Sequence, residues 1–336
     1  MNEKINFKEN EFGYIEYKSK NPYEFYQIFN ELDEAETQDS FGWLIFPEQG
    51  KKPYPVVVCA HGSDNWAGHH HEHILNFLNN GIAVFKAHSF DSRGVASTVE
   101  DQLSVTTAMM MVDVVEPLKF LSRHPDLDAN KIAITGWSLG GMVAFYAAWE
   151  PIMEKLAPNG ERFCAHLPFY PPTFLNPDEH RWSKAPILNL IGSDDDYTPG
   201  ILVKDICKEM KKAGADVEVY EFKKGHHSFD SIHPVTFWPE ALAINEKFAQ
   251  LKNDGSITFI TDEGKAMSAN SFEDRVKIFE TGEIKFGAHS GGDWSIRRDA
   301  MDQALSFMKK HLLLSLIHIS EPTRQAEISY AVFCLK

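Results

Sequence analysis

The stretch Lys131-Ile-Ala-Ile-Thr-Gly136-Trp-Ser138-Leu-Gly140-Gly-Met-Val-Ala-Phe-Tyr-Ala-Ala148 decides the fold of this chain. An apolar run leads into a serine between two glycines, and an Ala-rich run with helical composition follows. Small residues suit a turn so tight that neighbouring Cβ atoms would collide. Such a turn lifts the serine hydroxyl above a sheet, at a helix N-terminus where backbone N–H groups point outward. The pattern predicts a nucleophile elbow at Ser138, in preference to a simple packing turn.

On either side of this stretch, short apolar runs alternate with longer amphipathic ones. Most of the apolar runs are continuous, as strands buried on both faces are. The alternation predicts an α/β fold with a mostly parallel central sheet and helices on both faces. Strands are predicted at 42–46, 56–60, 82–87, 131–135, 163–167, 186–191 and 217–222, and helices at 72–80, 99–123, 139–150, 200–213 and 298–311.

The chain is expected to have three parts, which are an N-terminal entry segment at 1–40, an α/β domain at 41–313 and a tail at 314–336. Within the domain, the region of about 230–294 breaks the alternation of strand and helix. It contains a candidate hairpin at 253–264, framed by Asp-Gly and Glu-Gly turns. We therefore expect an insertion before the last helix, which either caps a pocket or decorates an edge of the sheet.

The tail differs in character from the rest of the chain. Leu314 to Arg324 resembles a sequencing-library adapter translated without a mismatch, and the block from Ile328 to Leu335 resembles the adapter end that follows a short index. Two matching blocks in the right order favour this origin over an ordinary C-terminal extension. We therefore exclude 314–336 from the reasoning about the fold.

A serine hydroxyl becomes a good nucleophile when a base removes its proton, and the base needs an acid to orient it. On a sheet with this elbow, the acid and then the histidine follow the serine, each at the end of a strand. An Asp-Asp-Asp run at 194–196 follows the strand predicted at 186–191, and a His-His pair at 226–227 follows the strand predicted at 217–222. The order and spacing therefore predict a catalytic triad.

These motifs resemble those of the dienelactone hydrolase family. The resemblance rests on the elbow, on Gly192-Ser-Asp-Asp-Asp-Tyr-Thr-Pro199 and on Gly225-His-His-Ser-Phe-Asp230. Two upstream blocks, Ala60-His-Gly-Ser63 and Ser89-Phe-Asp-Ser-Arg-Gly94, extend it, so that it covers roughly 56–230. The resemblance implies the α/β-hydrolase fold and no cofactor or metal.

The family pattern also selects the residues of the triad. It implies Asp195 as the acid and His227 as the base, each in preference to its neighbours. The family's namesakes carry cysteine in the elbow, where this chain has Ser138. That departure favours general ester hydrolysis over action on a dienelactone.

The oxyanion of an acyl-transfer intermediate needs two N–H donors. One is expected from the backbone of Leu139, which follows the nucleophile, and the other from Ser63 in the loop after the second core strand. We expect His61 to brace that loop.

Three weaker signals concern metal and substrate. In Gly68-His-His-His-Glu-His73 only His69 and His73 have a spacing that shares one helix face, so a solvated helix start is favoured over a metal site. Arg93 is a candidate substrate contact, with an Arg–Asp brace as the alternative. Trp137 is a candidate for the acyl pocket, with packing against the adjacent helix as the alternative.

Composition excludes several classes of protein. The formal net charge of the 336 residues is −15, which disfavours nucleic acid as a partner. The sequence contains no run of 18 apolar residues, so no membrane span is predicted. The first ten residues are charged and polar and lack the apolar region of a signal peptide, so we expect a cytoplasmic protein. No disulfide framework or zinc knuckle is expected from the four scattered cysteines, Cys59, Cys164, Cys207 and Cys334.

The sequence therefore predicts a serine hydrolase of carboxylic esters, acting on a small-molecule ester through an acyl-enzyme. Two alternatives remain open. The same triad serves peptidases and acyltransferases, and the fold also occurs in catalytically silent binding proteins.

Overall fold

Eight strands form one sheet at the centre of the computed structural model, which describes residues 5–313. Their order across the sheet is β1-β2-β4-β3-β5-β6-β8-β9. β2 runs antiparallel to both of its neighbours, and the other neighbouring pairs are parallel. The bounds are Gly13–Lys20 (β1), Thr37–Ile45 (β2), Tyr54–Ala60 (β3), Ala83–Ala87 (β4), Leu127–Trp137 (β5), His166–Phe169 (β6), Ile187–Gly192 (β8) and Val217–Phe222 (β9).

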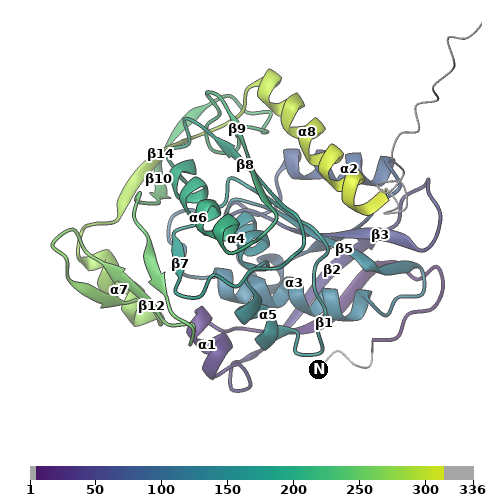
Figure 1. Ribbon diagram of the computed structural model, residues 1–336, viewed down its shortest axis with the longest axis horizontal. Coiled ribbons are helices and arrows are strands. Elements are labelled where there is room, and N and C mark those ends of the chain that lie inside the picture. The colour runs from purple at the N-terminus through teal and green to yellow at the C-terminus, as the bar shows by residue number, and fades with distance from the viewer. Residues whose placement is uncertain (1–4, 314–336) are drawn as a thin grey trace, which may run out of the picture.

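Helices cover both faces of this sheet, as the continuous apolar strands predict. Successive residues of β3 enter different cores, because side chains of a strand alternate between its faces. Val57 packs on the face that α2 (Gly68–Asn79) and α8 (Trp294–Met308) cover, and the two helices lie together in Figure 1. Val58 packs on the other face, under α3 (Thr107–Leu121), α4 (Leu139–Tyr146) and α6 (Gly200–Lys212). This is the α/β-hydrolase fold.

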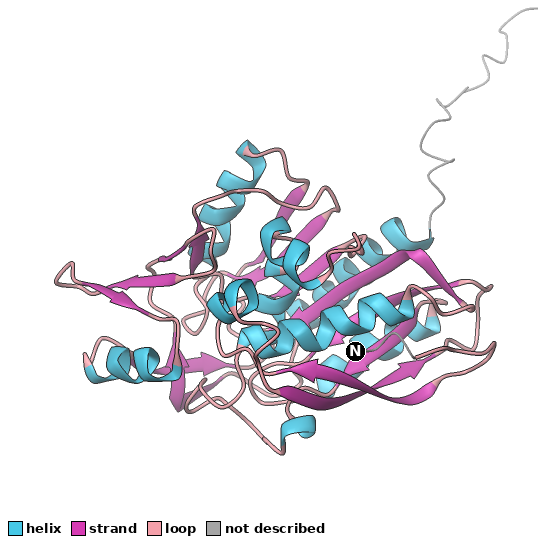
Figure 2. Ribbon diagram, turned by 90° about the horizontal axis from the view of Figure 1, so that it is seen from below, coloured by secondary structure: helices cyan, strands magenta, loops and turns pink. Residues whose placement is uncertain are grey.

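Residues 231–293, here called the cap segment, lie in the chain between the loop that follows β9 and the start of α8. They lie to one side of the large sheet in both views (Figure 1, Figure 2). A short strand of the main body, β7 (Leu175–Pro177), pairs in parallel with β11 and so joins the two parts. The cap segment contains β10 (Thr236–Ala243), β11 (Ala249–Leu251), β12 (Ile257–Ile260), β13 (Ala266–Ser268), α7 (Phe272–Glu280) and β14 (Lys285–Ser290).

Apart from shifts of a few residues at the ends of other elements, the structure differs from the predicted elements in three places. The first forty residues hold β1 and a short helix, α1 (Phe25–Asn30). α3 begins only at Thr107, because the side chain of Thr106 caps it by accepting a hydrogen bond from the N–H of Met109. The helix expected at 139–150 is two helices, since Pro151 suits the first turn of a new helix, α5 (Glu150–Leu156), better than the interior of an old one. The adapter-like tail lies outside the described residues.

Candidate active site

The elbow places Ser138 between the end of β5 and the start of α4. Its backbone has φ 52° and ψ −114°, a region that non-glycine residues rarely adopt. A Cβ on Gly136 would lie 2.1 Å from the carbonyl oxygen of Gly140, and one on Gly140 would lie 2.3 Å from that of Ala60. The glycines therefore permit a backbone contact that holds the serine in its strained turn.

Ser138, His227 and Asp195 come together at the carboxyl ends of three strands, β5, β9 and β8. Nε2 of His227 lies 2.9 Å from Oγ of Ser138, and Nδ1 of His227 lies 3.0 Å from Oδ2 of Asp195. The histidine is 3% exposed and the aspartate 7%. The three side chains thus form one hydrogen-bonded chain that is largely shielded from water.

The residues next to Asp195 and His227 in the sequence contact other partners. Asp194 accepts a hydrogen bond from the hydroxyl of Ser193, at 2.7 Å, and Asp196 pairs with the exposed His289 of the cap segment, also at 2.7 Å. The ring of His226 packs near that of His289 instead of reaching the serine. Geometry therefore distinguishes Asp195 from the acids on either side of it.

Thr198, which the sequence reasoning missed, binds both the acid and the base. Its hydroxyl oxygen lies 3.0 Å from Oδ2 of Asp195 and 3.0 Å from Nδ1 of His227, while its N–H donates to Oδ1 of Asp195 at 2.8 Å. The N–H of Tyr197 donates to the same oxygen at 3.0 Å. A signal was present in the sequence, because Thr is three residues after Asp195 and a carboxylate commonly accepts bonds from N–H groups two and three residues further on.

Leu139 and Ser63 face the same cavity as Ser138. Leu139 is the first residue of α4, so its N–H has no partner inside the helix. Ser63 lies in the loop after β3, and its hydroxyl is held by the side-chain amide of Gln102 at 3.0 Å. His61 braces this loop from within the core, since Nδ1 lies 2.9 Å from the carbonyl of Gly62. Burial lowers the pKa of His61 to about 4.

A cavity of about 180 Å³ opens beside Ser138. One part of its wall comes from the main body, including Phe25, Met142 and Phe174, and most of the wall is apolar. The remainder comes from the cap segment, so this insertion contributes to the wall of the cavity. The cap residues in the wall are Leu242, Ala243, Ile244, Asn245, Lys247, Ala249, Ile257, Phe259, Ala269, Arg275, Ile278, Phe279 and Ile284.

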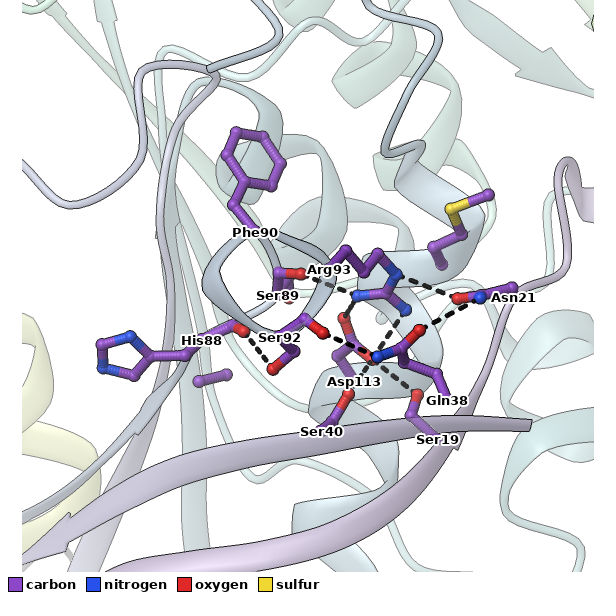
Figure 3. A network of polar contacts seen from close by, with 12 residues as sticks. Ser19, Asn21, Gln38, Ser40, His88, Ser89, Phe90, Ser92, Arg93 and Asp113 are labelled. Carbon is purple, nitrogen blue, oxygen red and sulfur yellow. Dashed lines mark hydrogen bonds and ion pairs between the residues drawn. The ribbon is translucent and has the colours of Figure 1, made fainter. Parts of the chain in front are cut away.

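Arg93 and Trp137 lie away from this cavity. The guanidinium of Arg93 forms a two-pronged pair with the fully buried Asp113, at 2.7 and 3.2 Å (Figure 3). An Arg–Asp brace is therefore present, with Asp113 as the partner. The indole of Trp137 is buried against the rings of Phe169 and His70, with ring centroids 5.3 and 4.5 Å apart, so it packs in the core instead of lining the pocket.

The prediction of a solvated histidine cluster at the start of α2 is wrong. His69 and His73 are buried and converge on the carboxylate of Asp230, with Nε2 at 3.8 and 3.0 Å from its oxygens. The hydroxyl of Tyr170 donates to the same carboxylate at 2.9 Å. Burial raises the pKa of Asp230, but the two histidines and the tyrosine outweigh it and leave the pKa lowered. Within residues 5–313, no group of three or more His, Cys, Asp or Glu side chains is arranged to hold a metal ion.

The sequence of this chain is similar to those of known proteins. A model of the dienelactone hydrolase family matches residues 42–246. A protein of Yersinia pestis named “Putative carboxymethylenebutenolidase” is 25% identical over 215 residues, which are 59% of this chain and 77% of that protein. One of the same name in Aquifex aeolicus (strain VF5) is 33% identical over 100 residues, 30% of this chain and 40% of that protein.

Among solved structures, a dienelactone hydrolase-like promiscuous phosphotriesterase from metagenomic libraries is similar with a TM-score of 0.52. The similarity covers 89% of this chain and 99% of that one at 15% sequence identity, which supports the fold. None of the helices within the described range has the length and apolar character needed to cross a membrane.

Proposed function

The chain belongs to the dienelactone hydrolase family, and we propose that it hydrolyses carboxylic esters through a Ser138–His227–Asp195 triad. The membership supports hydrolysis of a small-molecule ester. The roles of the individual residues are our proposal, and they follow from the chemistry that each side chain can perform at its place.

In the first half-reaction, Nε2 of His227 takes the proton of Ser138 as Oγ attacks the ester carbonyl carbon. Asp195 holds the imidazole in the tautomer with its proton on Nδ1 and stabilises the imidazolium that forms. The N–H groups of Leu139 and Ser63 stabilise the oxyanion, an interaction for which one donor is typically worth ~2.7–4 kcal/mol of barrier. The carbon–oxygen bond to the alcohol then breaks, and the alcohol leaves with the proton from His227.

In the second half-reaction, water attacks the acyl group on Ser138. His227 removes a proton from that water and returns it to Oγ of Ser138 as the acid leaves. The cycle consumes one ester and one water and yields one acid and one alcohol, so no cofactor or metal enters it.

One observation carries the proposal, namely the continuous chain of contacts from Ser138 Oγ to His227 Nε2, at 2.9 Å, and from His227 Nδ1 to Asp195 Oδ2, at 3.0 Å. The strained elbow supports it, because a packing turn would have no need of a non-glycine residue at φ 52°.

The test compares a short p-nitrophenyl ester with a peptide p-nitroanilide on the same enzyme preparation. We expect turnover of the ester and little of the anilide, and the reverse order would favour a peptidase. A fluorophosphonate probe should label the enzyme, and digestion with mass spectrometry should place the label on Ser138. Absence of both labelling and turnover would indicate a silent binding protein.

A further inference from the structure

The pocket beside Ser138 has a wall that suits apolar groups. From the cap segment, Ile257, Ile278 and Phe279 contribute to it, and from the main body Leu139 and Met142. Water in such a space finds few hydrogen-bond partners, so an apolar group that enters it gains the free energy of leaving water. The wall therefore favours hydrocarbon over polar groups.

The charges in this wall are already paired. Arg275 of α7 forms an ion pair with Glu24, which lies at the start of α1 and is 3% exposed. A second N–H group of the guanidinium donates to the carbonyl of Gln102 at 2.9 Å. Lys247, half-exposed, pairs with Asp262. Each cation of the wall is thus neutralised by a carboxylate of the protein.

Paired charges determine what the pocket rejects. A carboxylate on the substrate would give up its hydration and find Arg275, the more buried of the two cations, already bound to Glu24. The wall therefore disfavours an ester that carries a second, ionised acid group.

The size of the cavity sets the size of the group. About 180 Å³ is slightly more than the apolar cavity of ~150 Å³ that holds a benzene molecule in another protein. A phenyl ring or a chain of about six carbon atoms would fill it, whereas an acetyl group would leave most of it empty.

We propose that the physiological substrate is a neutral ester that bears an apolar group of about this size, and that the cap segment selects it. This inference rests on the proposed function, because it concerns the same site. It assigns selectivity to Arg275, Glu24 and the apolar cap residues, and it leaves bond cleavage to the triad.

The first test uses p-nitrophenyl esters from acetate to octanoate, together with acetates of alcohols of increasing length. In the acyl series kcat/KM should rise about fourfold per methylene, as expected for burying one CH2 group, up to about six carbons. The p-nitrophenyl monoester of adipic acid has the six-carbon length of the hexanoate, with a carboxylate in place of the terminal methyl group, and its kcat/KM should be at least tenfold lower than that of the hexanoate.

The second test narrows the pocket. Ile278→Trp adds bulk to the wall, whereas Ile232→Trp makes the same change at a residue that is 58% exposed and outside the wall. The ratio of hexanoate to acetate kcat/KM should fall at least tenfold in the first variant and stay constant in the second. If Ile278→Trp fails to fold, the comparison of adipate with hexanoate on the unaltered enzyme still decides.

The outcomes separate the two claims. Cleavage of acetate with no rise along the acyl series, or equal rates for hexanoate and adipate monoesters, would overturn the selectivity and leave the esterase intact. Failure to cleave any of the esters would overturn the esterase itself, and the selectivity with it.

Discussion

One arginine–carboxylate pair lies within the main body and another joins the cap segment to the body, and the two pairs are built differently. In the body, Asp113 is fully buried and accepts bonds from Arg93, Ser19 and Ser40 on elements close together in space (Figure 3). In the cap, Arg275 reaches across to Glu24 of the body, and its side chain remains 22% exposed.

This difference distinguishes how the two regions are held in place. The pair in the body ties β1, β2, α3 and the turn after β4 together within one core. The pair of the cap ties a peripheral helix to the body through one side chain, with the β7–β11 pairing as another connection. We infer that the body fixes the reacting groups, while the cap determines which ester reaches them.

The first prediction tests the chemistry of the main body and concerns the strongest effect. Ser138→Ala removes the nucleophile and should reduce kcat for every ester by at least ~10⁴-fold, because loss of a triad member leaves only the binding and oxyanion contributions. The loss should be equal for short and long esters, since the cap is untouched. Steady-state assays across the series measure it, and thermal unfolding should show a nearly unchanged Tm. An active Ala variant would exclude Ser138 as the nucleophile.

The second prediction concerns the pair in the body. Arg93→Met leaves the buried Asp113 without its cation, which should reduce the free energy of unfolding by about 3–5 kcal/mol. Arg181→Met provides a matched control, because its pairs with Glu154 and Glu179 lie on the surface, where such pairs are worth about 0–1 kcal/mol. Urea unfolding measures both variants. Equal stability of the two would show that the network of Figure 3 does not hold the body together.

The site could be predicted from the sequence to the extent that backbone geometry controls it. Gly136 and Gly140 indicate the elbow because their missing Cβ atoms permit a backbone contact that other residues would block. Asp195 and His227 follow their strands directly, so the topology brings them to the same edge. The predicted strands lie close to their observed positions for the same reason, since long apolar runs have few alternatives inside a sheet.

The pocket could not be predicted, because its wall joins segments far apart in the chain. Glu24 and Arg275 lie on different elements, and their pairing depends on how the cap segment docks. The histidines of α2 illustrate the same limit. Their polarity suggested exposure, but Asp230 and Tyr170 supply partners that only the folded chain brings near. Long-range pairing of polar groups leaves no local pattern in the sequence.

The third prediction uses the buried histidines of the body. Burial lowers the pKa of His166 to about 4, from 6.5, so the unfolded chain binds more protons than the native one between these values. Stability should therefore rise with pH across this window, and His166 should contribute about 2 kcal/mol of destabilisation at pH 5 relative to pH 7.5. His166→Asn, which keeps a donor near the carbonyl of Ala144, should reduce the pH dependence by that amount.

A control for this prediction is available in the cap segment. His233 is exposed, and His233→Asn should leave the difference in unfolding free energy between pH 5 and pH 7.5 unchanged. Urea unfolding at the two pH values measures both variants. If His166→Asn keeps the full difference in unfolding free energy between pH 5 and pH 7.5, protonation of His166 is not the cause of that difference.

The fourth prediction tests the connection between the cap segment and the main body and concerns the weakest effect. Arg275→Met leaves Glu24 buried without its cation beside the apolar wall, where burial already raises the pKa of this carboxyl group. The pocket then contains an unpaired acid, and the ratio of hexanoate to acetate kcat/KM should fall about tenfold, or ~1.4 kcal/mol. Glu24→Gln combined with Arg275→Met removes the charge as well, so this double variant should recover most of the ratio. If the pair has only a structural role, Arg275→Met should lower kcat/KM for hexanoate and for acetate together, and the double variant should recover neither. Selection by the cap is supported only if Arg275→Met changes the ratio and the added Glu24→Gln reverses that change.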